Sequence, residues 1–152
     1  MRLLLQREKH ILGKQNSYDE IVKTRAFLVF CAVGLVPIAL GYGAKPSVTL
    51  DAIFGINVDT TNLTHIMRAV MGLYLGMVVF WLYGAFRRSV EPAALAGCAV
   101  FMLGLAAGRV LSFIVDGMPH WLLVVYAVLE VVLGLVAVSL YRGHKREAPA
   151  SQ

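Results

Sequence analysis

Long apolar runs recur four times along the chain and predict its architecture. They extend over residues 26–42, 65–86, 93–115 and 120–141. A helix of about 20 predominantly apolar residues spans the hydrocarbon core of a bilayer, which is roughly 30 Å thick. The first run is somewhat short for this, and helix tilt or local thinning of the bilayer would absorb the difference. The pattern therefore predicts an all-α fold, a bundle of four transmembrane helices.

Both ends of the chain are polar and basic. For residues 1–25, which carry scattered leucine side chains among their charges, two interpretations stay open: a helix lying on an anionic leaflet, or a mobile tail. Residues 142–152 form the second basic segment. We interpret the first apolar run as an uncleaved anchor, because Lys45-Pro46 follows the small residue Ala44 at which a signal peptide would be cleaved.

Two of the connections carry capping and turn signals. In residues 43–64 an amphipathic stretch predicts a short helix, with Ser47 as its cap and Gly55 as its stop. Residues 116–119, Asp-Gly-Met-Pro, predict a tight turn, and Pro119 is suited to the first position of the next helix. We therefore expect a short surface helix after the first run and a sharp reversal before the last.

Composition supports contact with lipid. Hydrophobic residues make up 59% of the 152 residues and charged residues 15%, and the mean hydropathy is +0.72. A soluble domain of this size could not bury so much apolar surface. Cys31 and Cys98 lie inside apolar runs without the spacing of a disulfide framework or a metal site, so we interpret them as small buried residues. No metal or other cofactor is expected.

The positions of the basic residues predict an orientation. Eleven of the fourteen lysines and arginines lie in residues 1–25, 87–88 and 142–152. Because they flank apolar runs, the formal net charge of +5 indicates a membrane surface and not nucleic acid. The positive-inside rule places both termini in the cytoplasm and the loops 43–64 and 116–119 outside. We expect a multi-pass protein of a bacterial inner (plasma) membrane.

Three ionisable residues, Arg68, Arg109 and Glu130, lie inside apolar runs. A charge at the centre of a membrane helix costs roughly 2.5–3.5 kcal/mol on insertion scales, so such residues are expected to pair. At about 1.5 Å per helical residue they lie ~5, ~10 and ~15 Å below the outer surface. We predict an outward-facing cluster in which Glu130 pairs with Arg109 and is shared with Arg68. The positive charge left over would suit an anionic or lipid-like molecule.

Small residues lie on the same helix face as each of these charges and predict the faces at which helices approach closely. Gly72 and Gly76 follow Arg68 at four-residue spacing, Gly104, Gly108 and Ser112 have the same spacing, and Gly134 lies four residues after Glu130, with Ala127 and Ala137 near the same face. Around the predicted cluster, the secondary candidates for the site are His65, Asp116 and His120 at the outer mouth, Ser112 one turn above Arg109, and Tyr126 one turn above Glu130.

Three functions remain open for such a cluster. The first is binding of an anionic or lipid-like ligand. The second is an accessory or structural subunit of a larger membrane complex, or a homo-oligomer, in which the cluster is a structural ion-pair network. The third is a membrane enzyme with Glu130 or a histidine as proton carrier. No Ser-His-Asp set, phosphate loop or second deep carboxylate supports an enzyme, so no catalytic residue is assigned.

Three stretches together resemble a family of small bacterial four-helix membrane proteins that is catalogued only as a domain of unknown function. They are RAVMGLYLG (68–76), GLAAGRVLSFIVDGMPH (104–120) and the Glu of YAVLEVVLGL (126–135). The family pattern falls on Arg68, Gly72, Leu73 and Tyr74, on Gly108, Arg109, Ser112, Asp116, Gly117 and Pro119, and on Glu130. The resemblance covers roughly residues 27 to 142 and implies an integral inner-membrane protein with no established activity. In plan the chain is also similar to DoxX-like proteins, an analogy of fold alone.

Overall fold

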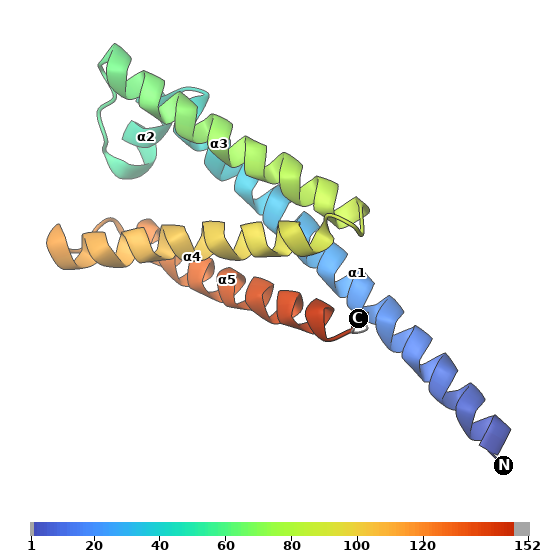
Figure 1. The fold of residues 1–152 in the computed structure, drawn as a ribbon. Helices are drawn as coiled ribbons and strands as arrows, with labels where there is room; N and C mark the ends of the chain where they lie inside the picture. Colours follow the sequence, from blue (N-terminus) through green and yellow to red (C-terminus); the bar gives the residue numbers. More distant parts are fainter. Residues whose placement is uncertain (1, 148–152) are drawn as a thin grey trace.

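The computed structural model describes residues 2–147, and the side chains of residue 15 and of residues 18–144. Within that range the chain forms five helices and no strand (Figure 1). They are α1 (Arg2–Gly43), α2 (Pro46–Phe54), α3 (Thr61–Phe86), α4 (Glu91–Val115) and α5 (Trp121–Glu147). All except α2 contain a stretch long and apolar enough to cross a membrane. The predicted all-α fold with four membrane-spanning helices is confirmed.

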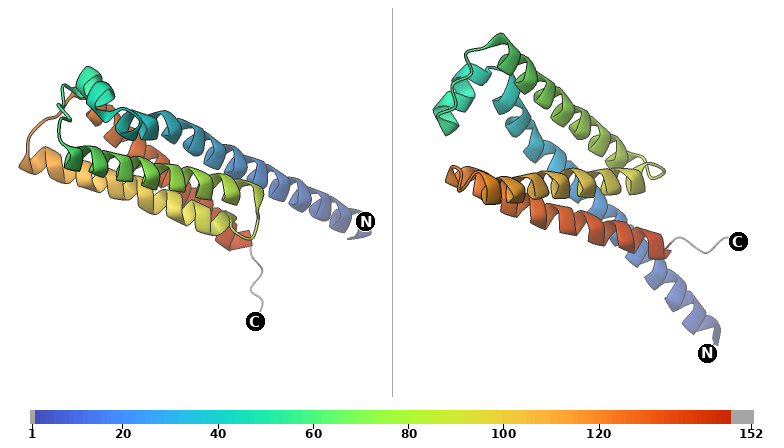
Figure 2. Two further views of the ribbon diagram at one scale, coloured as in Figure 1. Left: turned by 90° about the horizontal axis from the view of Figure 1, so that it is seen from above. Right: turned by 60° about the vertical axis from the view of Figure 1, so that its left-hand side comes forward.

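The four long helices form two pairs. α1 packs along α3, and α4 packs along α5. The pairs are joined by the 87–90 turn between α3 and α4, and from there they splay apart (Figures 1 and 2). We call the end of the bundle at this turn the turn end, and the opposite end, which carries α2, the α2 end. Both chain termini extend from the turn end (Figure 2).

Close packing between the two pairs is concentrated toward the turn end. A Cβ atom added at Gly84 of α3 would collide with Ala94 of α4, and one added at Gly97 would lie 2.9 Å from the Phe80 ring. The largest fully buried side chain, Trp81, packs edge-on against Phe101 with ring centroids 5.5 Å apart. The two pairs are thus locked together near the 87–90 turn, and the space between them lies toward the α2 end.

The first helix is much longer than the apolar run that predicted it. α1 has 42 residues, which at about 1.5 Å per residue makes it roughly 63 Å long, about twice the thickness of a hydrocarbon core. Residues 2–25 are helical and continue the spanning helix, and the N-terminal part of α1 projects beyond the bundle (Figure 1). Contact of this segment with an anionic leaflet stays a prediction. Strong helix formers and the absence of proline in this segment explain the continuation. Residues 148–152 of the predicted tail lie outside the described residues.

The capping prediction for α2 is partly wrong. Lys45 occupies the N-cap without a side-chain hydrogen bond, and Pro46 provides the first turn, so Ser47 does not cap this helix. A proline is favoured there because its missing N–H has no partner in the first turn anyway. The stop at Gly55 is confirmed: its φ is 68°, and its N–H donates to the Asp51 carbonyl at 2.8 Å.

Other helix boundaries differ from the apolar runs by a few polar residues. α3 begins at Thr61, because the Thr60 hydroxyl accepts a hydrogen bond from the Leu63 N–H at 3.2 Å. α5 begins at Trp121, so Pro119 precedes the helix and does not open it. Gly117 supplies the turn with a φ of 92°, a conformation that glycine adopts without strain.

Candidate functional site

An ion pair joins α4 to α5 in the α2 half of the bundle. Arg109 donates from Nε to both carboxylate oxygens of Glu130, at 3.0 Å to Oε1 and 2.8 Å to Oε2. The Glu130 residue is 8% exposed. α4 and α5 run antiparallel from a short connection, with Arg109 seven residues before Asp116 and Glu130 ten residues after His120. These comparable spacings bring the two charges to one level of the bundle.

Arg68 is not part of this pair. It lies exposed on α3, and among the described residues it makes no ion pair. α3 belongs to the other helix pair and diverges from α4 toward the α2 end, which separates Arg68 from Glu130 (Figure 1). The predicted three-residue cluster is therefore corrected to a pair, and its formal charge is zero instead of positive.

The small-residue stripes have three different environments. On α5 the prediction is confirmed: Ala127, Gly134 and Ala137 are buried, and a Cβ at Gly134 would lie 2.6 Å from Leu103. On α3 it is wrong, because Gly72 and Gly76 are exposed with no atom within 4 Å of an added Cβ. On α4, Gly104 and Gly108 are also free of close contact, and both line a cavity. The α4 stripe thus forms a wall instead of a helix-packing face.

Three tyrosines surround the guanidinium group of Arg109. Its Cζ atom lies 5.8 Å from the ring centroid of Tyr126, a cation–π distance. Tyr42 of α1 lies within electrostatic reach of Arg109 and packs edge-on against Tyr74 of α3, with ring centroids 5.9 Å apart. The sequence predicted Tyr126 as a candidate for the site, whereas Tyr74 was named only as part of the family motif. Tyr42 was missed because it ends the first apolar run, where aromatic residues are ordinary.

Three cavities meet at this group of residues. The inner cavity, about 180 Å³, lies among all four long helices and is lined by Phe30, Cys31, Gly34, Leu35, Ile38, Tyr74, Met102, Leu105, Arg109, Tyr126, Leu129, Glu130 and Leu133. The α2 cavity, about 260 Å³, is lined by Pro37, Ile38, Gly41, Tyr42, Leu50, Ile53, Phe54 and Tyr126. The α3–α4 cavity, about 380 Å³, is lined by Tyr42, Met67, Val70, Tyr74, Gly104, Leu105, Gly108, Arg109 and Ser112.

The shared lining residues place the ion pair beside two of these cavities, and two tyrosines connect those cavities to the third. Arg109 and Tyr74 line both the inner and the α3–α4 cavities. Tyr126 lines both the inner and the α2 cavities, and Tyr42 both the α2 and the α3–α4 cavities. Arg109 and Glu130 therefore border open space within the bundle instead of being enclosed by close-packed side chains.

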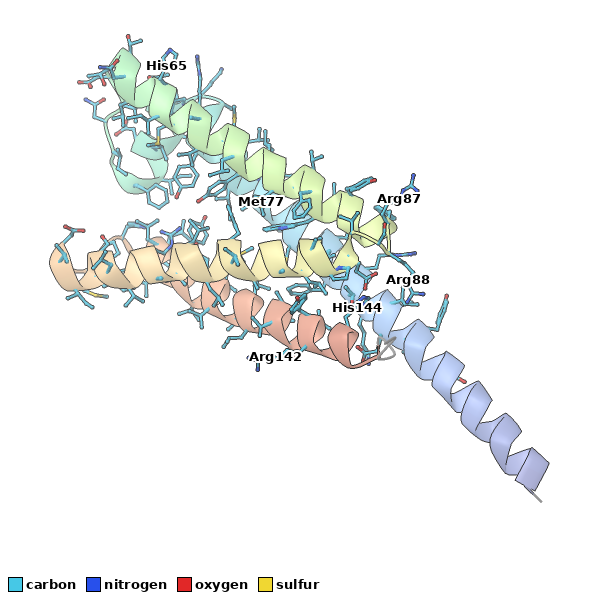
Figure 3. All side chains as sticks on the ribbon, in the orientation of Figure 1. His65, Met77, Arg87, Arg88, Arg142 and His144 are labelled. Carbon is cyan, nitrogen blue, oxygen red and sulfur yellow. The ribbon has the colours of Figure 1, made fainter. Side chains whose placement is uncertain are left out.

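The remaining candidates lie around the α2 end. Ser112 donates from Oγ to Asp116 Oδ2 at 2.7 Å, a bond along α4, and Ser112 also lines the α3–α4 cavity. The His120 ring packs edge-on against Phe54 of α2 with centroids 5.7 Å apart, and its Nδ1 accepts from the Leu122 N–H at 3.4 Å. His65 is exposed at the start of α3 (Figure 3). Of these four residues, Ser112 alone lines one of the three cavities.

A second buried charge lies at the turn end, and the sequence reasoning missed it. Glu91, the first residue of α4, is 3% exposed, and its Oε1 lies 3.7 Å from His144 Nδ1 of α5. Arg88 and buried Thr24 border the same small space (Figure 3). Glu91 does not stand out in the sequence, because an acidic residue in the first turn of a helix is common. No group of three or more His, Cys, Asp or Glu side chains that could hold a metal ion exists among the described residues.

The chain belongs to the family described as Domain of unknown function (DUF4345), whose pattern matches residues 23–141. The match includes the four membrane-spanning stretches almost completely and leaves out residues 1–22. It confirms, at the level of the family, the resemblance drawn from the three sequence motifs. Searches of curated proteins and of solved structures found no match.

Proposed function

We propose that this member of the DUF4345 family is an integral membrane protein that binds a lipid-like small molecule at the Arg109–Glu130 pair. The observation that carries the proposal is that Arg109 lines both the inner and the α3–α4 cavities and that Glu130 lines the inner cavity. Ionisable residues inside a membrane are costly and tend to mark functional sites. An ion pair needed only for packing would gain nothing from open space beside it.

The charge of the pair favours a neutral hydrogen-bond acceptor over an anion. Glu130 already neutralises Arg109, and Arg68, which would have supplied an extra positive charge, lies elsewhere. Both bonds to Glu130 come from Nε, so the carboxylate does not use the four N–H donors on the two Nη atoms. A carbonyl, ester or hydroxyl oxygen can accept from these donors, whereas an anionic group would compete with Glu130 and suffer its repulsion.

The distribution of basic residues supports an orientation with the α2 end outside. Arg87, Arg88 and Arg142 lie at the turn end (Figure 3), from which both termini also extend. By the positive-inside rule, we propose that the turn end lies in the cytoplasm. That the membrane is a bacterial inner membrane is proposed only from the family resemblance. In this orientation Arg109 and Glu130 lie in the outer half of the bilayer.

Native mass spectrometry of gently extracted protein tests the binding proposal. Wild type should retain a lipid-like adduct of defined mass, Arg109→Ala should lose it, and Glu130→Gln should retain less of it. Arg68→Ala is the matched control, because it removes an exposed arginine of a neighbouring helix and should leave the adduct unchanged. An adduct that survives Arg109→Ala in a protein with an unaltered melting temperature would refute the proposal.

A specific observation keeps a second function in view, that of an accessory subunit of a larger membrane complex. Gly72 and Gly76 form an exposed stripe on α3 with no atom within 4 Å of an added Cβ, and such stripes allow close approach of another membrane helix. In this function the Arg109–Glu130 pair is a structural ion-pair network. Copurification of a defined membrane partner that Gly72→Leu abolishes would support it.

A further inference from the structure

We infer that the ligand enters the site sideways from the bilayer, through an opening between α1 and α5, and that it is a single-chain amphiphile whose chain lies in the inner cavity. This inference rests on the proposed function and extends it to the route of entry and the class of ligand. It is carried by the course of the inner cavity, from the buried ion pair to exposed residues of two helices that barely touch.

The inner cavity connects the core of the bundle to its lipid-facing surface. At its deep end lie Glu130 and Tyr74, which are 8% and 7% exposed. At its shallow end lie Phe30 and Leu129, which are 66% and 49% exposed, and Gly34, which is exposed as well. Phe30 and Gly34 belong to α1 and Leu129 to α5, so the opening lies between these two helices.

α1 and α5 leave this opening because each packs mainly against another helix. α1 packs against α3 and α5 against α4, whereas α1 and α5 have almost no backbone contact with each other. They do approach at the turn end, where Thr24 of α1 and His144 of α5 border one small space. At Gly34 an added Cβ would have no atom within 4 Å, so no side chain of α5 closes the gap at that point.

The depth of the opening determines what can enter it. Gly34 lies nine residues before the end of α1 at Gly43, and Leu129 lies eight residues after the start of α5 at Trp121. At about 1.5 Å per residue, both lie ~12–14 Å from the α2 end of their helices, within a hydrocarbon core roughly 30 Å thick. The residues at the opening are apolar, so it faces acyl chains and admits a molecule that is already dissolved in the membrane.

The size and chemistry of the cavity identify the class of molecule. Its volume of about 180 Å³ is below the roughly 300–1,000 Å³ typical of sites that enclose a drug-sized ligand. It therefore has room for one apolar chain segment, and the second chain of a two-chain lipid would have to stay outside it. At the deep end the Nη donors of Arg109 meet the polar head, which carries a neutral oxygen acceptor. A monoacylglycerol, with one chain and a head of one ester and two hydroxyls, has this chemistry.

Photolabelling with a monoacylglycerol that carries a diazirine in its chain tests the inference in phosphatidylcholine nanodiscs. In wild type we expect saturable labelling of α1 between Phe30 and Ile38 and of α5 between Leu129 and Leu133, competed by unlabelled monoacylglycerol. Gly34→Phe should abolish this labelling by filling the opening, and Leu129→Trp should reduce it from the opposite helix. Gly72→Phe, the same change at an exposed glycine of α3, should leave it unchanged.

The outcomes separate the route from the site. Two results would overturn lateral entry and leave the proposed function intact. The first is labelling that depends on Arg109 but is insensitive to both Gly34→Phe and Leu129→Trp. The second is labelling that falls instead on Met67 and Ser112 of the α3–α4 cavity. Absence of any saturable labelling in wild type, with this probe and with the matching fatty acid, would overturn both. Because two variants close the opening from different helices, misfolding of one, detected by its melting temperature, still leaves the test decisive.

Discussion

Removing one member of the Arg109–Glu130 pair should destabilise the protein more than removing both members together. Breaking a buried ion pair by removing one partner costs about 3–5 kcal/mol. The Arg109 and Glu130 side chains are 17% and 10% exposed, and Arg109 borders two cavities that allow some hydration. For Glu130→Leu we therefore expect the lower end, about 3 kcal/mol, which is roughly a hundredfold in the unfolding equilibrium.

Each single variant leaves one ionisable side chain without its partner. In Glu130→Leu the guanidinium of Arg109 loses the carboxylate that neutralises it, and arginine stays protonated in proteins. In Arg109→Met, Glu130 loses both of its hydrogen bonds from Nε, at 3.0 and 2.8 Å. In the double variant Arg109→Met/Glu130→Leu neither group remains, so no unpaired charge is left in the bundle.

Equilibrium unfolding in mixed detergent micelles, measured at one pH with wild type beside the two single variants and the double variant, gives these differences directly. Each single variant should lose stability, and the double variant should recover most of the loss, because no unpaired charge remains. Additive losses in the double variant, or a loss below about 0.5 kcal/mol in Glu130→Leu, a size typical of surface substitutions, would refute this reasoning.

Three further predictions follow from the packing and the orientation. Gly84→Leu should lower stability by about 1–3 kcal/mol in the same unfolding assay, because it forces a side chain into α4 beside the turn. Cys98, which is 0% exposed and lines none of the three cavities, should resist a membrane-permeant maleimide until the protein unfolds, as judged by mass shift. In Val48→Cys, a change at an exposed residue of α2, the new thiol should react with an impermeant maleimide added to intact cells. In Arg142→Cys it should react only after the membrane is opened. The reverse pattern would contradict the proposed orientation.

The features that the sequence predicted correctly are those set by single segments. The length of an apolar run determines whether a helix can span a membrane, whatever its neighbours. The pairing of Arg109 with Glu130 was predictable for a related reason: a turn of a few residues forces the flanking helices to run side by side, so counting from the turn places both charges at one depth. The buried stripe of Ala127, Gly134 and Ala137 follows from the same contact.

The features that the sequence did not predict depend on which helices pair. Arg68 lies beside small residues just as Arg109 does, but α3 packs against α1, and nothing in the sequence of α3 indicates this choice. The exposure of Gly72 has the same cause. Glu91 was missed because its burial requires the end of α5 to return to the start of α4, a contact between residues more than fifty positions apart. Periodicity reveals which face of a helix is apolar, whereas helix pairing decides which face is covered.

The placement of the ion pair separates a structural function from a binding function. Arg109 and Glu130 connect α4 to α5, two helices that a five-residue connection and packing along their length already hold together. The weak contact of the bundle is the one between the two helix pairs at the α2 end, and the ion pair does not bridge it. A molecule lying in the inner cavity would contact Gly34 and Ile38 of α1, Arg109 of α4 and Leu129 of α5 at once. Such a ligand supplies the contact between the helix pairs that the side chains leave out, so binding should raise the melting temperature of wild type more than that of Arg109→Ala.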